Sequence, residues 1–176
     1  MLEFYKFTDK ENKVLLDSMT ILCDTREVKN QHILDYFDKA KVKYEIRKLD
    51  YGDYSVKIAK NEELGIPRDL YFDKEVVIER KGSLDELAGN LTKERDRIKK
   101  ELSLAPKTKV IMIEDCSYSD LVEGNYRSQF SVKSFLGSLH SMWFAYDAPF
   151  FFVDDKKWSG AFIQGYFTYW LKNYLR

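Results

Sequence analysis

The chain has 176 residues, and its 29 basic and 29 acidic side chains give no formal net charge at pH 7. A hydrophobic content of 44% is sufficient for a core, and the length favours a single domain. No stretch reaches the roughly 18 apolar residues of a membrane span, and the N-terminus lacks the apolar core of a signal peptide. Two cysteines are too few for a disulfide framework or a cysteine metal site. We therefore expect a cytoplasmic protein with no membrane association.

Hydrophobic periodicity and capping patterns predict alternating helices and strands. In chain order, the expected elements are a helix over 8–18, a strand over 20–24, a helix over 30–41, a strand over 43–49, a turn at 51–53, a strand over 54–58, a loop over 59–68, strands over 70–72 and 75–81, a helix from 83, a helix continuing or starting at 92 and running to about 104, a strand over 109–114, a short helix over 119–123, a helix over 131–146, a strand over 150–153 and a helix over 156–175.

Alternation of strands and helices is typical of the α/β class. The hairpin-like strands around Gly52 and Asp73 favour a mixed sheet. We expect one domain over residues 1–176 with three parts, namely an N-terminal extension helix over 1–19, a core over 20–153 and an aromatic C-terminal helix over 154–176.

One predicted strand carries the residues with the strongest chemical signal. The β-branched run 76–78 leads directly into Glu79-Arg80-Lys81. Residues two apart in a strand point to the same face, so Glu79 and Lys81 project side by side, and Asp53 can join them from a neighbouring strand. Two carboxylates suit Mg²⁺ or Mn²⁺, and a lysine beside them can position a water or stabilise charge on a phosphate. A surface ion pair at a sheet edge is the simpler interpretation, but a buried carboxylate without a partner is costly.

Three motifs in this order resemble the nuclease domain of the XPF family of structure-specific endonucleases. They are Asp24-Thr25-Arg26-Glu27 after a buried strand, Gly52-Asp53, and Glu79-Arg80-Lys81 followed by Asp85. The resemblance covers about residues 20–153 and implies a restriction-endonuclease-like core, with a mixed central sheet flanked by helices. It also implies metal-dependent cleavage of DNA, including branched DNA, and a role in DNA repair or recombination. The helicase and helix-hairpin-helix domains of many members are not found, so a stand-alone form is expected.

The resemblance also implies roles for the residues around this centre. Asp53 and Glu79 are expected to hold the metal and Lys81 to assist catalysis. Asp24 is a further acidic residue near the metal, although it can also be a cap at the end of its strand. Supporting roles fall to the residues that complete the motifs, namely Arg26 and Glu27 as phosphate contacts or supports, Arg80 as the partner of an acidic group on the opposite strand face, and Asp85 as a helix-dipole residue or a group that orients Lys81 or Arg80.

Basic residues concentrate after this strand. Seven of them lie within residues 93–109 with acidic residues interleaved, so a solvated helix face is one interpretation. Their position next to the acidic motif favours the alternative, in which Arg95, Arg97 and Lys99 contact DNA phosphates. Arg95 roughly matches an arginine of the family, but the spacing is about one residue longer, which leaves Arg97 as a rival.

The C-terminal helix carries two aromatic stripes. One holds Trp158, Phe162, Tyr166 and Tyr169, and the other holds Ile163, Phe167, Trp170 and Tyr174. A helix that is apolar on most sides is buried on most sides, so one stripe can pack on the sheet and the other on a second subunit. Full burial within one domain is the alternative. Nuclease domains of the family dimerise through their helical side, so we expect a homodimer with Phe167 and Trp170 in its interface.

These observations lead to one main functional hypothesis, a Mg²⁺- or Mn²⁺-dependent DNA endonuclease. No P-loop is present, so no nucleotide cofactor is expected. Two alternatives belong to other classes, namely a catalytically silent DNA-binding partner of the same fold and a protein-interaction module that uses the aromatic helix. A composition rich in lysine, asparagine, isoleucine and tyrosine favours a bacterial or phage origin.

Overall fold

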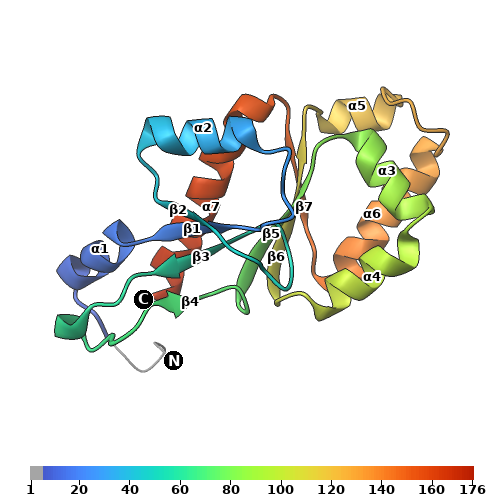
Figure 1. Cartoon of the computed structure of the whole chain (residues 1–176). Helices are drawn as coiled ribbons and strands as arrows, with labels where there is room; N and C mark the ends of the chain where they lie inside the picture. The colour runs from blue at the N-terminus through green and yellow to red at the C-terminus, as the bar shows by residue number, and fades with distance from the viewer. Residues whose placement is uncertain (1–5) are drawn as a thin grey trace.

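A mixed sheet separates two groups of helices in the computed structural model, which describes residues 6–176 (Figure 1). Seven strands form the sheet within these residues, namely β1 (Thr20–Cys23), β2 (Tyr44–Ile46), β3 (Tyr54–Ile58), β4 (Leu70–Tyr71), β5 (Val76–Lys81), β6 (Thr108–Glu114) and β7 (Phe150–Val153). The helices are α1 (Asp9–Asp17), α2 (Gln31–Ala40), α3 (Leu84–Thr92), α4 (Arg95–Leu104), α5 (Tyr118–Glu123), α6 (Val132–Tyr146) and α7 (Ser159–Tyr174). The α/β class and the mixed sheet are therefore confirmed.

The sheet joins a mixed half, in which β1 and β2 are parallel and β3 is antiparallel to its neighbours, to a parallel half at β5. The strand order is β2-β1-β3-β5-β6-β7, with β4 paired to β3. β3 runs antiparallel to β1 and β5, whereas β5, β6 and β7 are mutually parallel. Tyr54 is opposite Ile78 in the register of β3 and β5. Asp53, one residue before Tyr54, therefore lies beside the part of β5 that ends in Glu79 and Lys81.

Alternation along the strands supplies two separate cores. Val110 and Met112 of β6 face the core formed with α2 and α7, whereas Ile111 and Ile113 face the core formed with α3, α4 and α6. These strands are apolar on both faces because helices cover both faces. The two cysteines are free and buried, and each lies in a different core.

Besides shifts at the ends of other elements, two segments depart from the sequence-based expectation. β2 ends at Ile46, three residues early, because the backbone N–H of Leu49 donates to the Asp24 carboxylate instead of a strand neighbour (2.6 Å). The expected loop over 59–68 contains a short 3-10 helix, Glu62–Leu64, capped by the Asn61 side chain. Among residues 6–176, no helix is both long and apolar enough to cross a membrane.

The structure corrects the expected role of Phe167 in α7. Phe167 is fully buried and packs in the core with Ile163 and Leu171, and Trp170 packs edge-on against Phe72. This stripe therefore faces the sheet, and Phe167 is not available to a second subunit. The other stripe faces outward, and its Tyr169 is 66% exposed. Both stripes are aromatic, so hydrophobicity alone did not distinguish the sheet-facing one.

Candidate active site

The end of β5 presents an acid and a base side by side. Glu79 and Lys81 lie on one face of the strand, and Lys81 Nζ contacts Glu79 Oε1 at 2.8 Å. Lys81 is buried. Burial lowers the pKa of its ammonium, but the Glu79 carboxylate outweighs this effect and the pKa is raised overall. Lys81 therefore stays protonated and keeps its positive charge inside the site.

Asp53 reaches the same place through a tight turn. Its Oδ2 accepts a hydrogen bond from the backbone N–H of Arg80 at 2.7 Å, and its own N–H donates to the carbonyl of Ile78 at 2.8 Å. Gly52 before it has φ of +70°, and a Cβ there would lie 2.7 Å from Val77 Cβ. A residue with a side chain is therefore excluded at position 52, and this explains why glycine precedes the aspartate.

The Asp53 carboxylate is held in an unfavourable electrostatic environment. Burial and the neighbouring Glu79 carboxylate raise its pKa well above the usual range for aspartate. The Glu79 carboxylate therefore repels a negative charge on Asp53. Within residues 6–176, Asp53 Oδ1 and Glu79 Oε2 have no hydrogen-bond partner. A divalent cation would relieve this repulsion.

The opposite face of β5 carries a buried ionic network. Arg80 Nη2 contacts Glu114 Oε2 at 2.6 Å and Arg80 Nη1 contacts Glu27 Oε1 at 3.3 Å, while His32 Nε2 lies 2.9 Å from Glu114 Oε1. As the strand alternation predicts, Arg80 points away from Glu79 and pairs with acidic groups. Sequence reasoning missed Glu114 and His32. For Glu114 the available signal was an acid at the end of an apolar strand, the same pattern that identified Glu79.

Asp24 is fully engaged within the chain. Its oxygens accept hydrogen bonds from Arg26 N, Nε and Nη2 and from Leu49 N, at 2.6 to 3.1 Å. Burial raises the pKa of Asp24, but the Arg26 hydrogen bonds outweigh burial and lower it overall. The Arg26 side chain is 64% exposed and lines the same cavity as Asp53. Asp24 thus has the contacts of a strand-end cap and holds Arg26 at the rim.

The structure contradicts one expected contact of Asp85. Its carboxylate accepts hydrogen bonds from Arg127 N, Arg127 Nε and Ser128 N, at 2.8 to 3.1 Å. In the described part of the chain it bonds to neither Lys81 nor Arg80, so it does not orient them directly. Asp85 instead connects the first turn of α3 to the segment that precedes α6, because α3 starts immediately after β5 and its first turn faces that segment.

The basic segment forms α4, and its two arginines diverge. Arg95 Nη1 donates to Ser138 Oγ of α6 at 3.1 Å. Arg97 lines the cavity and pairs with Glu94 and, at 3.1 Å, with Glu101. Lys99 is partly buried and is not part of the cavity lining. Of the two rival arginines, Arg97 is the one beside the acidic pair.

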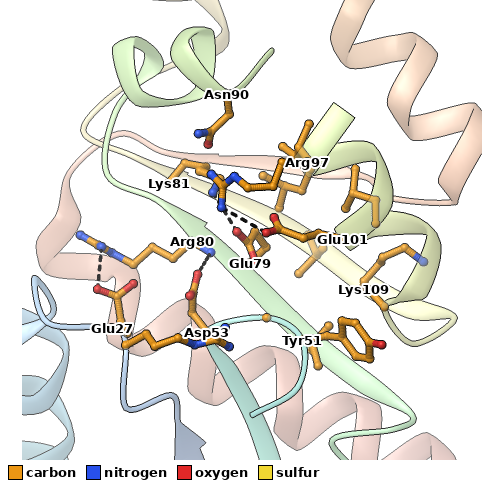
Figure 2. A pocket seen from close by; sticks show the side chains of 18 of the residues that line it. Glu27, Tyr51, Asp53, Glu79, Arg80, Lys81, Asn90, Arg97, Glu101 and Lys109 are labelled. Carbon is orange, nitrogen blue, oxygen red and sulfur yellow. Dashed lines mark hydrogen bonds and ion pairs between the residues drawn. The ribbon is translucent and has the colours of Figure 1, made fainter. Parts of the chain in front are cut away.

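A cavity of about 320 Å³ lies between β5, β6 and α4 (Figure 2). Asp53, Glu79, Lys81, Arg26 and Arg97 all line it. Within residues 6–176, no three histidine, cysteine or acidic side chains are grouped as a metal cage. The two acids still fit Mg²⁺ or Mn²⁺, because such ions are commonly held by one or two carboxylates together with waters and substrate phosphates.

The sequence profile of the ERCC4 domain matches residues 23–166. The chain belongs to the ERCC4 domain family. The matched range contains the acidic pair, Lys81 and the helices that surround the cavity. A search of curated proteins gave no match.

Solved structures similar to this ERCC4 domain include two of XPF from Aeropyrum pernix. One has a TM-score of 0.60 at 18% identity and covers 84% of this chain and 59% of that chain. The other, a complex with DNA, has a TM-score of 0.63 at 17% identity and covers 88% of this chain and 66% of that chain. The chain thus spans about three-fifths to two-thirds of these proteins. The restriction-endonuclease-like fold of the XPF nuclease is therefore confirmed, and the family and fold support a nuclease-type domain.

Proposed function

We propose that the protein is a Mg²⁺- or Mn²⁺-dependent endonuclease that hydrolyses phosphodiester bonds in DNA, with branched DNA as its preferred substrate. The observation that carries this proposal is the convergence of Asp53, Glu79 and Lys81 in one cavity, where both acids keep a free oxygen. The similarity to an XPF structure that contains DNA agrees with it. A simple surface ion pair would require neither the burial of Lys81 nor a second carboxylate, that of Asp53, close enough to Glu79 to repel it.

Each residue of the site has a distinct task in this proposal. Asp53 and Glu79 would hold the cation, which when bound supplies charge neutralisation at the phosphate and a more acidic water. Arg80 fixes Asp53 Oδ2 through its backbone N–H, and its side chain is anchored by Glu114. Lys81 stabilises negative charge that develops on the phosphate.

The residues at the rim are proposed to position the DNA. Arg26, held by Asp24, and Arg97 lie at the cavity and are placed to contact phosphates on either side of the scissile one. Asp24 acts through Arg26 because its own oxygens are occupied. Lys99 extends the basic surface along α4, whereas Arg95 supports the packing of α4 on α6.

A plasmid-nicking assay with and without Mg²⁺ or Mn²⁺ tests the proposal. Wild-type protein should nick DNA only with the cation, and Asp53→Asn and Glu79→Gln should each abolish nicking while the circular dichroism spectrum stays unchanged. DNA binding without any cleavage would favour the silent DNA-binding partner, and neither binding nor cleavage would favour the protein-interaction module. Unchanged nicking by both variants would remove the two acids from the mechanism.

We also propose a homodimer that forms through the sheet edge at β7. We define the aromatic edge as Trp143, Phe144, Phe151, Phe162, Tyr166 and Tyr169. Phe144 is 84% exposed, and the Phe151 and Phe162 rings lie 5.5 Å apart. β7 ends the sheet order, so its outer backbone groups are not paired within the described residues. A second copy related by two-fold symmetry would cover both the strand edge and these rings.

A further inference from the structure

The cavity continues beyond the acids into an apolar recess. We define the apolar recess by Val77 and Ile111 of β5 and β6, by Ile98 and Leu102 of α4, and by Ala105 at the end of α4. All five residues line the cavity that contains Asp53, Glu79 and Lys81. Ile98, Leu102 and Ile111 also pack in the core between the sheet and α4, and each is no more than 6% exposed. The cavity space beside them, next to a charged centre, suits an occupant that is flat and largely apolar.

Polar and aromatic groups surround the recess. Tyr51 stands two residues before Asp53, and Lys109 lies at the opposite end of the cavity from Lys81 (Figure 2). Lys109 is 8% exposed, and its Nζ donates to the carbonyl of Pro106 at 2.9 Å. An ammonium has three donors, and within residues 6–176 Lys109 has no other hydrogen-bond partner and no ion pair. Two buried donors are therefore available at the end of an apolar recess.

The size of the cavity restricts the occupant. Its volume of about 320 Å³ lies at the lower end of the roughly 300–1,000 Å³ range of small-molecule sites. A duplex cannot enter such a space, whereas one nucleotide can place its phosphate at the acids and its base in the recess. Tyrosine rings offer a stacking surface to any base, and a lysine can donate to the oxygen or nitrogen acceptors on a base edge.

We propose that the apolar recess binds one unstacked nucleobase of the cleaved strand, on the nucleotide that adjoins the scissile phosphate. The inference rests on the proposed endonuclease function for the position of that phosphate. Tyr51 stacks on the base and Lys109 donates to its edge. Unstacking is least costly for a base that is already unpaired. The recess thus favours cleavage beside a flap or fork over cleavage within an intact duplex.

Filling the recess tests this proposal without touching the acids. Ala105→Phe places a ring in the recess, and Leu104→Phe adds the same side chain at the neighbouring, exposed position, which does not line the cavity. The probe is a set of labelled flap duplexes that each carry one abasic residue at a different position across the junction. Binding is measured by fluorescence anisotropy in EDTA, so that it depends on neither metal nor catalysis.

We expect wild-type protein and Leu104→Phe to lose about tenfold in affinity at one abasic position, the size of one lost stacking contact. Ala105→Phe should bind the intact flap about tenfold more weakly and show no further loss at that position. Tyr51→Ala should behave like Ala105→Phe, and Tyr51→Phe like wild type. If wild-type protein shows no position-dependent loss, or Ala105→Phe retains it, the base site is refuted.

Cleavage of the same duplexes separates this inference from the proposed function. If wild-type protein cuts the flap in Mg²⁺ or Mn²⁺ but binds every abasic duplex with the same affinity, the endonuclease function is supported and the base site is refuted. If one abasic position weakens binding but no cation supports cleavage, the base site is supported and the endonuclease function is refuted. Where Ala105→Phe fails to fold, the comparison of Tyr51→Ala with Tyr51→Phe decides in its place.

Discussion

Glu79 acts on its two neighbours in ways that have opposite consequences for charge. It raises the pKa of Lys81 and so keeps the ammonium charged, and together with burial it raises the pKa of Asp53 and so favours the neutral acid. The site in the absence of metal is therefore poised to exchange a proton on Asp53 for a cation. Metal affinity should increase with pH until Asp53 is ionised.

The repulsion between Asp53 and Glu79 should change how the free energy of unfolding depends on pH. An unfolded aspartate has a pKa of about 3.9, whereas folded Asp53 titrates higher, so the folded state binds the extra proton. Stability therefore falls as pH rises from about 4 to the folded pKa. Asp53→Asn should remove this fall and give a metal-free protein that is modestly more stable than wild type at neutral pH. Urea unfolding in EDTA from pH 4 to pH 8 measures the free energy of unfolding of both proteins.

The matched control for this experiment is Asp50→Asn, which changes an exposed acid near the site. Hydrogen bonding and the charge of Lys74 lower the pKa of Asp50. Its substitution should therefore leave stability unchanged or reduce it at neutral pH. Equal pH profiles for wild type and Asp53→Asn would contradict the assigned repulsion.

Lys81→Ala should separate catalysis from metal binding. Loss of a preorganised charge at the reacting phosphate lowers the rate by roughly 10²-fold or more. The acids remain, so calorimetry should still detect Mn²⁺ binding. A collapse of Mn²⁺ affinity with the lost rate would instead assign Lys81 a structural role.

The residues of the site were predictable to different degrees. Local alternation placed Glu79, Arg80 and Lys81 on the correct strand faces, because that rule depends on one strand only. The partners of Asp85 and Glu114 depended on which segments the fold brings together, and the chain separation of Asp85 from Arg127 hid that contact. The capping role of Asp24 was foreseen as an alternative, but its bond to Leu49 required the end of β2 to be known.

At the scale of elements, the strands and helices were predicted within a few residues, whereas the orientation of α7 was not. Helix and strand periods are local properties of the sequence. The choice between two aromatic stripes depends on the surface that receives the helix, here the face of the sheet formed by residues such as Val56 and Met112. A single sequence contains no local signal for that choice.

The orientation of α7 predicts different costs for two aromatic truncations. Phe167→Ala removes a fully buried ring and should lower the free energy of unfolding by about 3–5 kcal/mol. Tyr169→Ala removes a ring two residues away that is exposed in the single chain, and at a protein concentration low enough to keep the chain monomeric it should change the free energy of unfolding by no more than about 0.5 kcal/mol. Equilibrium urea unfolding compares the two, and similar losses would contradict this orientation of the helix.

At the scale of the whole molecule, the site lies where the mixed and parallel halves of the sheet meet. Asp53 precedes β3, the strand that runs antiparallel to β5, and Glu79 and Lys81 stand at the end of β5, which both halves share. The fold class followed from the order of elements. The cavity under α4 and the aromatic edge did not, because both depend on packing between segments that are distant in the chain.

The proposed homodimer leads to a prediction about assembly. Phe144→Glu combined with Phe151→Glu should convert a dimer into a folded monomer, because charged side chains would be buried in the interface. The control is Val28→Glu, at an exposed apolar residue outside the aromatic edge. Light scattering at tens of micromolar, where a modest interface is filled, measures the mass. A wild-type monomer under these conditions would refute the dimer.

Each side of the sheet contains one buried cysteine, whose alkylation rate can report the opening of that side. Cys23 is buried among the residues around α2 and α7, and Cys116 among those around α3 and α6. Burial raises the pKa of both thiols to about 12, so neither reacts readily until its surroundings open. Alkylation rates of the two thiols therefore report whether the two layers of helices loosen together or one before the other.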